Sequence, residues 1–325
     1  MAATLAELVV VTDLFPLNAP FRISRGVKTI AEVLRVVMVR DGVAGRGECV
    51  PYARYGESLS STTAAIEAVR DEIQRGATRQ ELLSLLPAGA ARNAVDCALW
   101  DLELRKGRTA VQARPVATAM TVSLDTPERM AEAATLLADA PLVKVKVDRE
   151  NPADALRAVR NAAPNPRLIV DPNESWTIAE VDALQGLMTD LRVDLLEQPL
   201  PADADGDLAG YRSAIPIAAD ESIHVAEDIE TLPDGYSVVN IKLDKTGGRT
   251  AALALAEAAR ARGLGVMTGC MISSSLSIAP AWTIAEGSDF VDLDGPLWLA
   301  KDREGGVQGS NGLLTPPQPG FWGDF

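Results

Sequence analysis

Histidine and cysteine are scarce in this 325-residue chain, and their scarcity excludes several kinds of site. The one histidine, His224, rules out sites built on two histidines and a serine–histidine–aspartate triad at any other position. The three cysteines are odd in number and far apart, so they indicate neither a disulfide framework nor a zinc knuckle. No stretch approaches the roughly 18 uncharged apolar residues of a membrane-spanning helix.

Basic residues are also few, at 31 Lys plus Arg against 45 Asp plus Glu, which gives a net charge of −14. Nucleic acid and anionic membranes attract basic surfaces, so neither is expected as a partner. The first 15 residues carry Glu7 and Asp13 and show no basic start or small-residue cleavage site. We therefore expect a cytoplasmic protein with a small-molecule partner. Whether it forms a homo-oligomer is left open.

The N-terminal third has the pattern of an α+β domain, here residues 1–112. Apolar alternation predicts strands, and Gly76 and Gly107 stop two helical patterns. Thr78 and Glu81 have the spacing of a capping box, which predicts a short helix after them. The expected strands are 5–12, 31–40 and 45–50, with a loop over 16–29 and further helices over 60–75 and 89–106.

From about residue 115, short β-branched apolar runs alternate with helical segments, the pattern of βα units around a parallel sheet. Eight such runs in residues 113–298 predict a lean (β/α) barrel of the TIM type. A doubly wound open sheet is the alternative, but no Gly-x-Gly-x-x-Gly follows any run. Residues 299–325 are expected to form a tail that packs on the N-terminal domain. The eight runs are 118–124, 142–147, 167–170, 193–196, 215–219, 237–243, 265–268 and 290–293.

Charged residues stand at the ends of most of these predicted strands. Barrel strands all end at one mouth, which is where the chemistry of this architecture is found. One charged strand end is commonplace, but a whole series that converges on one mouth indicates a site. The series is Lys144 and Lys146, Asp171, Glu197, Asp220, Lys242, and Asp292 with Asp294.

Three of these residues, Asp171, Glu197 and Asp220, lie on successive strands, so their oxygens can meet at one point. Clustered carboxylates repel each other unless a cation lies among them. Hard oxygen ligands without cysteine or paired histidines favour Mg²⁺ or Mn²⁺ over zinc. The alternative is a cluster of salt bridges with the lysines of the same mouth.

Lys144 and Lys146 are two residues apart on one strand, so they face the same side about 7 Å apart. Repulsion between two such charges favours the neutral amine and is expected to lower a lysine pKa toward the ~7–8 that suits a general base. Lys242 lies four strands further round, on the opposite wall of an eight-strand barrel. Two bases that face each other suit racemisation, epimerisation or elimination.

Asp292 and Asp294 also share one face, and no metal partner is obvious for them. Two uncovered carboxylates at a barrel mouth can receive a substrate ammonium. Solvated aspartates at a strand end are the alternative for this pair, considered alone.

These motifs together resemble the enolase superfamily in its muconate-lactonizing branch, and within it the bacterial L-Ala-D/L-Glu dipeptide epimerases. The resemblance covers nearly the whole chain. It is carried by Lys144-Val-Lys146, Asp171-Pro-Asn-Glu174, Leu196-Glu-Gln-Pro199, Ala219-Asp-Glu-Ser222, Asn240-Ile-Lys-Leu-Asp-Lys-Thr-Gly-Gly248, Gly269-Cys270-Met271, Asp292-x-Asp294 and Pro87-Ala-Gly-Ala-Ala-Arg-Asn93.

The resemblance implies an α+β capping domain over a (β/α)7β barrel and an isomerase that acts on dipeptides of murein metabolism. It implies Mg²⁺-dependent interconversion of L-Ala-D-Glu and L-Ala-L-Glu through an enediolate, by proton transfer between two lysines. The roles it implies are Asp171, Glu197 and Asp220 for Mg²⁺, Lys146 and Lys242 for acid–base catalysis, Lys144 for electrostatic assistance, Asp292 and Asp294 for the ammonium, and Arg25 for the glutamate side chain. Pro172 departs from the pattern, where Ala is expected, and changes no catalytic expectation.

Two other classes of function stay open at this point. The same fold and the same metal and lysines would serve a cycloisomerase, an o-succinylbenzoate synthase or an N-acyl amino acid racemase. A non-catalytic barrel that binds a metal or a dipeptide is the third possibility. The presence of both candidate bases, Lys146 and Lys242, argues against it.

Overall fold

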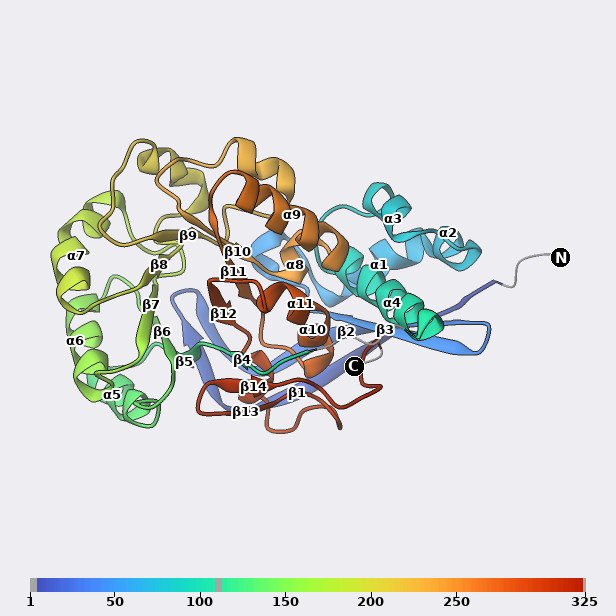
Figure 1. Cartoon of the computed structure of the whole chain (residues 1–325), viewed down its shortest axis with the longest axis horizontal. Helices are drawn as coiled ribbons and strands as arrows, with labels where there is room; N and C mark the ends of the chain where they lie inside the picture. The colour runs from blue at the N-terminus through green and yellow to red at the C-terminus, as the bar shows by residue number, and fades with distance from the viewer. Residues whose placement is uncertain (1–4, 109–112, 324–325) are drawn as a thin grey trace.

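The structure is a computed structural model that describes residues 5–108 and 113–323, so the expected domain boundary at residue 112 lies outside the described residues. An antiparallel sheet with four helices lies beside an eight-stranded barrel (Figure 1). No helix in the described part of the chain is long and apolar enough to cross a membrane.

The N-terminal sheet consists of β1 (Glu7–Ile23), β2 (Gly26–Arg40) and β3 (Val43–Cys49), paired antiparallel in that order. The predicted loop over residues 16–29 is wrong, because β1 and β2 continue through it as one long hairpin. Their register shifts between Pro16 and Phe21. β1 is an edge strand, where proline costs no ladder hydrogen bond on its free side.

Five helical segments follow: η1 (Ala53–Tyr55), α1 (Leu59–Ala68), α2 (Arg70–Arg75), α3 (Arg79–Leu85) and α4 (Ala90–Gly107). The single helix expected over residues 60–75 is two helices, and Ser58 caps the first of them. The capping box of Thr78 and Glu81 is confirmed, since each side chain bonds the other's backbone N–H.

Helix α4 packs on the sheet at very close range. A Cβ at Gly47 of β3 would lie 2.1 Å from the Ala94 carbonyl oxygen of α4, so no side chain fits there. The close approach buries most of one face of α4 against β2 and β3.

The predicted eight-stranded parallel barrel is confirmed. The sheet order β12-β11-β10-β9-β8-β7-β6-β5 follows the chain, and the Ala119 N–H donates to the Val291 carbonyl 2.7 Å away, which ties the two ends together. The strands are β5 (Met120–Val122), β6 (Leu142–Lys146), β7 (Arg167–Asp171), β8 (Leu195–Glu197), β9 (Ile217–Ala219), β10 (Val238–Ile241), β11 (Gly265–Gly269) and β12 (Phe290–Asp292).

Each connection between barrel strands is helical, which gives the (β/α)7β order. Thr126 and Thr177 cap the helices that follow β5 and β7, where each side chain accepts a hydrogen bond from a backbone N–H three residues on. The connections after β8 and β9 contain only 3₁₀ turns. The segments are α5 (Pro127–Thr135), α6 (Pro152–Ala162), α7 (Ile178–Asp190), η2 (Ala202–Leu208), η3 (Ala226–Glu230), α8 (Leu243–Thr246), α9 (Arg249–Ala261), α10 (Ser275–Ile278), η4 (Ala279–Ala281) and α11 (Trp282–Ala285).

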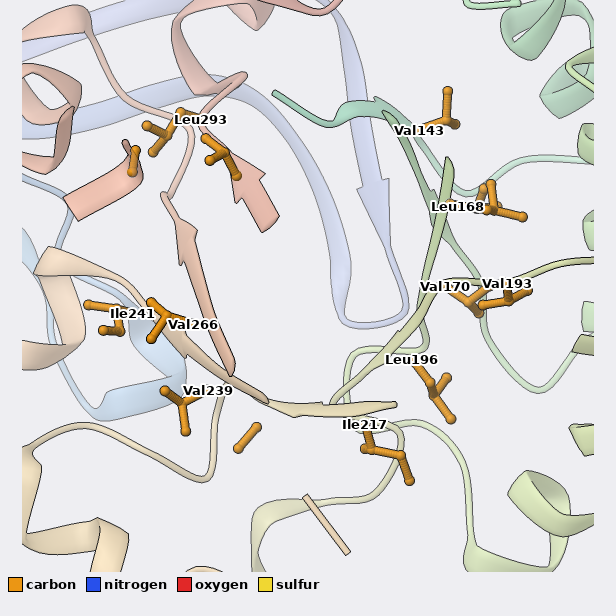
Figure 2. Close-up of a cluster of buried hydrophobic side chains, with 14 of the residues drawn as sticks. Val143, Leu168, Val170, Val193, Leu196, Ile217, Val239, Ile241, Val266 and Leu293 are labelled. Carbon is orange, nitrogen blue, oxygen red and sulfur yellow. The ribbon is translucent and has the colours of Figure 1, made fainter. Parts of the chain in front are cut away.

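Side chains alternate between the two faces of the barrel strands. Figure 2 shows the outward set, including Val143, Leu196 and Val266, around the outside of the ring against the helices. The inward set begins with one buried apolar residue from each strand or its start, which closes the base of the barrel. The next inward residues toward the mouth are the polar series found in the sequence.

The end of the chain contacts both parts of the molecule. After η5 (Gly295–Trp298), β13 (Gln308–Ser310) and β14 (Leu313–Thr315) pair with β4 (Val116–Ala117). Phe321 and Trp322 pack near Trp100 of α4, and the Trp322 indole donates to the Arg46 carbonyl 3.0 Å away.

A buried ion-pair group joins the sheet, the barrel and the tail. Glu48 of β3 has no exposed surface and accepts hydrogen bonds from Ser274 and from Arg303, whose Nη2 lies 2.6 Å from Glu48 Oε2 and 2.6 Å from Asp13 Oδ2. Losing one partner of such a pair leaves a buried charge without compensation.

We therefore expect Arg303→Met to destabilise the fold by about 3–5 kcal/mol. Arg212→Met is the matched control, because Arg212 pairs with Asp234 on an exposed surface and its loss should cost less than about 1 kcal/mol. Urea unfolding followed by circular dichroism measures both. Equal stability of the two variants would mean that the Glu48–Arg303 pair contributes little.

Candidate active site

A cavity of about 400 Å³ lies between the barrel mouth and the N-terminal sheet. The tip of the β1–β2 hairpin and the loop after β3 line one side, and the barrel strand ends line the other. In Figure 2 the pale blue hairpin projects over the opening of the strand ring. Seven of the nine predicted site residues line the cavity: Arg25, Lys144, Lys146, Asp220, Lys242, Asp292 and Asp294.

The other two predicted residues, Asp171 and Glu197, are fully buried beside the cavity and contact Lys144. The Lys144 Nζ lies 3.0 Å from Asp171 Oδ2, 2.7 Å from Glu197 Oε2 and 2.8 Å from Asp292 Oδ2. An ammonium group therefore lies among carboxylates from three different strands. Lys144 and these three carboxylates thus form one cluster, although any two of the four residues are at least 26 positions apart in the sequence.

The two outer lysines pair with different carboxylates. Lys146 Nζ lies 2.5 Å from Asp171 Oδ2, and Lys242 Nζ lies 2.6 Å from Asp220 Oδ2. Lys146 belongs to β6 and Lys242 follows β10, four strands away in the sheet of eight, so they occupy opposite walls. Gly269 makes room for Lys242, since a Cβ there would lie 3.0 Å from Lys242 Cε.

The pKa expected for the Lys144–Lys146 pair is wrong for Lys144. Burial lowers the pKa of Lys144, but Asp171, Asp292 and Glu197 outweigh burial and hold it well above its usual range. The sequence reasoning counted the repulsion between two lysines and underestimated the buried carboxylates around them. Burial and the charge of Asp171 raise the pKa of Glu197 to about 7.

Two buried carboxylate oxygens at the site contact only cationic groups. Glu197 Oε2 and Asp220 Oδ1 accept no hydrogen bond, and each lies 2.7 Å from a lysine ammonium, of Lys144 and Lys245 respectively. Within residues 5–108 and 113–323, no group of three or more acidic, histidine or cysteine side chains is already arranged to bind a metal ion. The donor chemistry, three buried carboxylates around a positive charge, fits a hard divalent cation.

Asp292 and Asp294 both line the cavity but differ in their partners. Asp292 is ion-paired with Lys144, so the expectation of two uncovered carboxylates is wrong for this residue. Asp294 lies beyond the end of β12, where its Oδ2 accepts from the Thr121 N–H at 2.9 Å and from the Trp298 indole at 3.2 Å. Burial and the charge of Asp292 raise the pKa of Asp294 to about 6.

Arg25 sits in the two-residue turn of the hairpin and contacts the barrel. Its Nη2 lies 2.6 Å from Glu221 Oε1 and its Nη1 lies 3.0 Å from Glu174 Oε2. Arg54, from the loop after β3, makes two further hydrogen bonds of 2.7 Å to Glu174. We call these four residues the mouth ion-pair group.

Sequence reasoning gave no role to Glu174, Glu221 or Lys245. Lys245 is buried and donates to the Asn240 carbonyl at 3.0 Å and to the Asp220 carbonyl, so it ties the ends of β9 and β10 together. The available signal for it was a second lysine three residues after Lys242, just beyond the end of a buried strand.

Two family descriptions cover most of the chain. Residues 5–114 match the mandelate racemase / muconate lactonizing enzyme N-terminal domain, and residues 128–321 match the enolase C-terminal domain-like family. The chain belongs to the enolase superfamily. Its resemblance to the muconate-lactonizing branch, predicted from the strand-end motifs, is confirmed.

Among relatives of this superfamily member, an L-Ala-D/L-Glu epimerase of Escherichia coli strain K12 is 46% identical over 311 residues, 93% of this chain and 97% of that protein. An N-acetyl-D-glutamate racemase of Pseudoalteromonas sp is 44% identical over 303 residues, 89% of this chain and 94% of that protein.

Solved structures of the superfamily share the fold of this chain. An enolase family member from Agrobacterium tumefaciens, with bound sodium and L-Ala-L-Glu, has a TM-score of 0.95 and 44% identity, covering 98% of this chain and 100% of that one. A dipeptide epimerase from Methylococcus capsulatus, complexed with Mg and L-Arg-D-Lys, has a TM-score of 0.88 and 32% identity, covering 99% and 100%.

Proposed function

We propose that this protein is a Mg²⁺-dependent dipeptide epimerase that interconverts L-Ala-D-Glu and L-Ala-L-Glu. Its superfamily and its epimerase and racemase relatives make it an isomerase. The observation that carries the proposal is the pair Lys146 and Lys242 on opposite walls of one cavity, with three buried carboxylates beside them.

Asp171, Glu197 and Asp220 would hold the metal ion, since they are buried oxygen donors at the ends of successive strands. When bound, Mg²⁺ supplies positive charge that stabilises the oxygen charge developing on a substrate carboxylate. Structures of epimerase relatives with Mg support this choice of ion.

The two lysines would carry the proton transfer. The neutral amine of one lysine takes the α-proton of the second residue, and the ammonium of the other returns a proton to the opposite face of the same carbon. The net reaction inverts the carbon, and one proton is exchanged between the two walls. Lys144, within 3.0 Å of two of the carboxylates, adds a fixed positive charge beside the enediolate oxygens.

The ends of the dipeptide would be held by charged groups that line the same cavity. Asp292 and Asp294 present carboxylates to the substrate ammonium. Arg25 presents a guanidinium to the side-chain carboxylate, with donors left beyond those that bond Glu174 and Glu221.

The reaction can be tested by incubating the purified protein with Mg²⁺ and L-Ala-L-Glu in D₂O and following the glutamyl α-proton by NMR. We expect that signal to disappear while the L-Ala-D-Glu epimer appears, because the returned proton is drawn from the solvent. Absence of both changes with Mg²⁺ bound would exclude this substrate and direct the search to other dipeptides.

Racemisation of N-acetylglutamate is the second candidate, favoured by the relative of that name and by the ion pair that already engages Asp292. An acetylated nitrogen carries no charge and needs no carboxylate receptor. The same NMR assay with N-acetyl-L-glutamate separates the two, since an ammonium receptor predicts faster exchange of the free-amine dipeptide.

A further inference from the structure

The cavity is lined by six cationic side chains, and five of them have an acidic partner. Arg25 and Arg54 belong to the mouth ion-pair group, and the three barrel lysines pair with Asp171, Asp220, Glu197 and Asp292. Lys28 is the exception: it forms no ion pair with any residue that the structure describes.

The mouth ion-pair group is electrically balanced. Two guanidinium groups face two carboxylates, and Glu174 accepts from both arginines. An incoming carboxylate therefore finds no net charge on Arg25 and its partners, although hydrogen-bond donors are available there. The net positive charge at this wall comes from Lys28.

Lys28 is held where it can reach the cavity. It lies on β2 opposite Phe21 of β1, and both residues line the cavity. Its Nζ lies 4.9 Å from the centre of the Tyr52 ring, a cation–π contact that positions the ammonium without neutralising it. Phe21 packs edge-on against Trp298, whose indole bonds Asp294.

We propose that Lys28 is a specificity-determining residue that selects a second residue with an acidic side chain. The proposal rests on the proposed function, which supplies the dipeptide in this cavity. Arg25 then supplies directional hydrogen bonds, and Lys28 supplies the uncompensated charge that distinguishes a carboxylate from an amide of the same shape.

The test compares L-Ala-L-Glu with L-Ala-L-Gln, which differ in side-chain charge but not in size. For Lys28→Met we expect kcat/KM and affinity for L-Ala-L-Glu to fall about tenfold to a hundredfold, and those for L-Ala-L-Gln to change less than about threefold. Lys28→Arg should restore the preference because the charge returns. Lys301→Met, at an exposed lysine outside the cavity, is the matched control.

Calorimetric titration of both dipeptides in the presence of Mg²⁺ separates this proposal from the proposed function. If the wild type binds L-Ala-L-Glu but does not epimerise it, the function fails and the binding ratio still decides the role of Lys28. A parallel loss for both dipeptides, an unchanged ratio in Lys28→Met, or a wild type without preference for Glu over Gln each overturns the proposal.

Discussion

Lys146→Ala and Lys242→Ala are each expected to abolish epimerisation of L-Ala-L-Glu and to leave α-hydrogen exchange on opposite epimers. A lysine on one wall can reach only one face of the α-carbon, and these two lie four strands apart in the barrel. Each variant therefore keeps the base for one epimer and loses the base for the other. Full inversion needs both.

The expected loss of inversion is at least about a thousandfold in kcat, the scale of a positioned acid–base group. NMR in D₂O, started separately from L-Ala-L-Glu and from L-Ala-D-Glu, measures inversion and exchange together. Lys301→Ala should match the wild type, because Lys301 is exposed and lies outside the cavity.

Thermal unfolding of the same variants separates catalysis from folding. Asp171 keeps Lys144 as a partner after Lys146 is removed, and Asp220 keeps Lys245 after Lys242 is removed. Both variants should therefore remain folded at assay temperature. Equal loss of exchange from both epimers in each folded variant would argue against two opposed bases.

The barrel and its mouth could be predicted from the sequence because parallel strands impose a simple geometry. The inward residues of β6 are Leu142, Lys144 and Lys146, one apolar residue at the base and two charges toward the mouth. The same apolar-to-charged step leads from Ile169 to Asp171 at the end of β7 and from Ala218 to Asp220 just after β9. Side chains alternate between the two faces of a strand, and all strands of the barrel run in the same direction. These two rules were enough to predict that the charged side chains meet at one mouth.

The contacts between the sheet and the barrel were beyond the same reasoning. Nothing in the local pattern shows that the turn at Arg25 would meet Glu221, a residue 196 positions away. Strands were predicted for the base of the hairpin, over residues 5–12 and 31–40, but its distal part over residues 16–29 was missed, because none of those side chains is buried and no hydrophobic alternation marks the pairing there. Contacts between the hairpin and the barrel depend on how the folded sheet packs against the folded barrel, so the local sequence pattern does not predict them.

The lysine pKa was misjudged for a related reason. Repulsion between Lys144 and Lys146 is a property of one strand, and the sequence displays it. Asp171, Glu197 and Asp292 lie on three other strands, each within 3.0 Å of the Lys144 Nζ, and their attraction outweighs the effect of burial on the pKa of Lys144. Contacts across the barrel, rather than the neighbour along the strand, therefore set the direction of the pKa shift of Lys144.

Glu197→Gln is expected to reduce metal affinity and epimerisation together. Glu197 is fully buried, and its Oε2 accepts no hydrogen bond. The amide keeps the shape of the side chain but removes one negative charge from the three carboxylates that would hold Mg²⁺. Loss of a group that contributes several kcal/mol of charge stabilisation should lower kcat at least about a hundredfold.

Binding of Mn²⁺, followed by electron paramagnetic resonance, measures the metal site without reference to turnover. We expect the Kd for Mn²⁺ to rise at least about tenfold in Glu197→Gln and to stay unchanged in Glu227→Gln, the same substitution at an exposed position outside the cavity. Chelation of the wild type with EDTA should abolish epimerisation, and added Mg²⁺ should restore it. Full activity after chelation would overturn the metal requirement, whereas unchanged Mn²⁺ affinity in Glu197→Gln would place the metal on other residues.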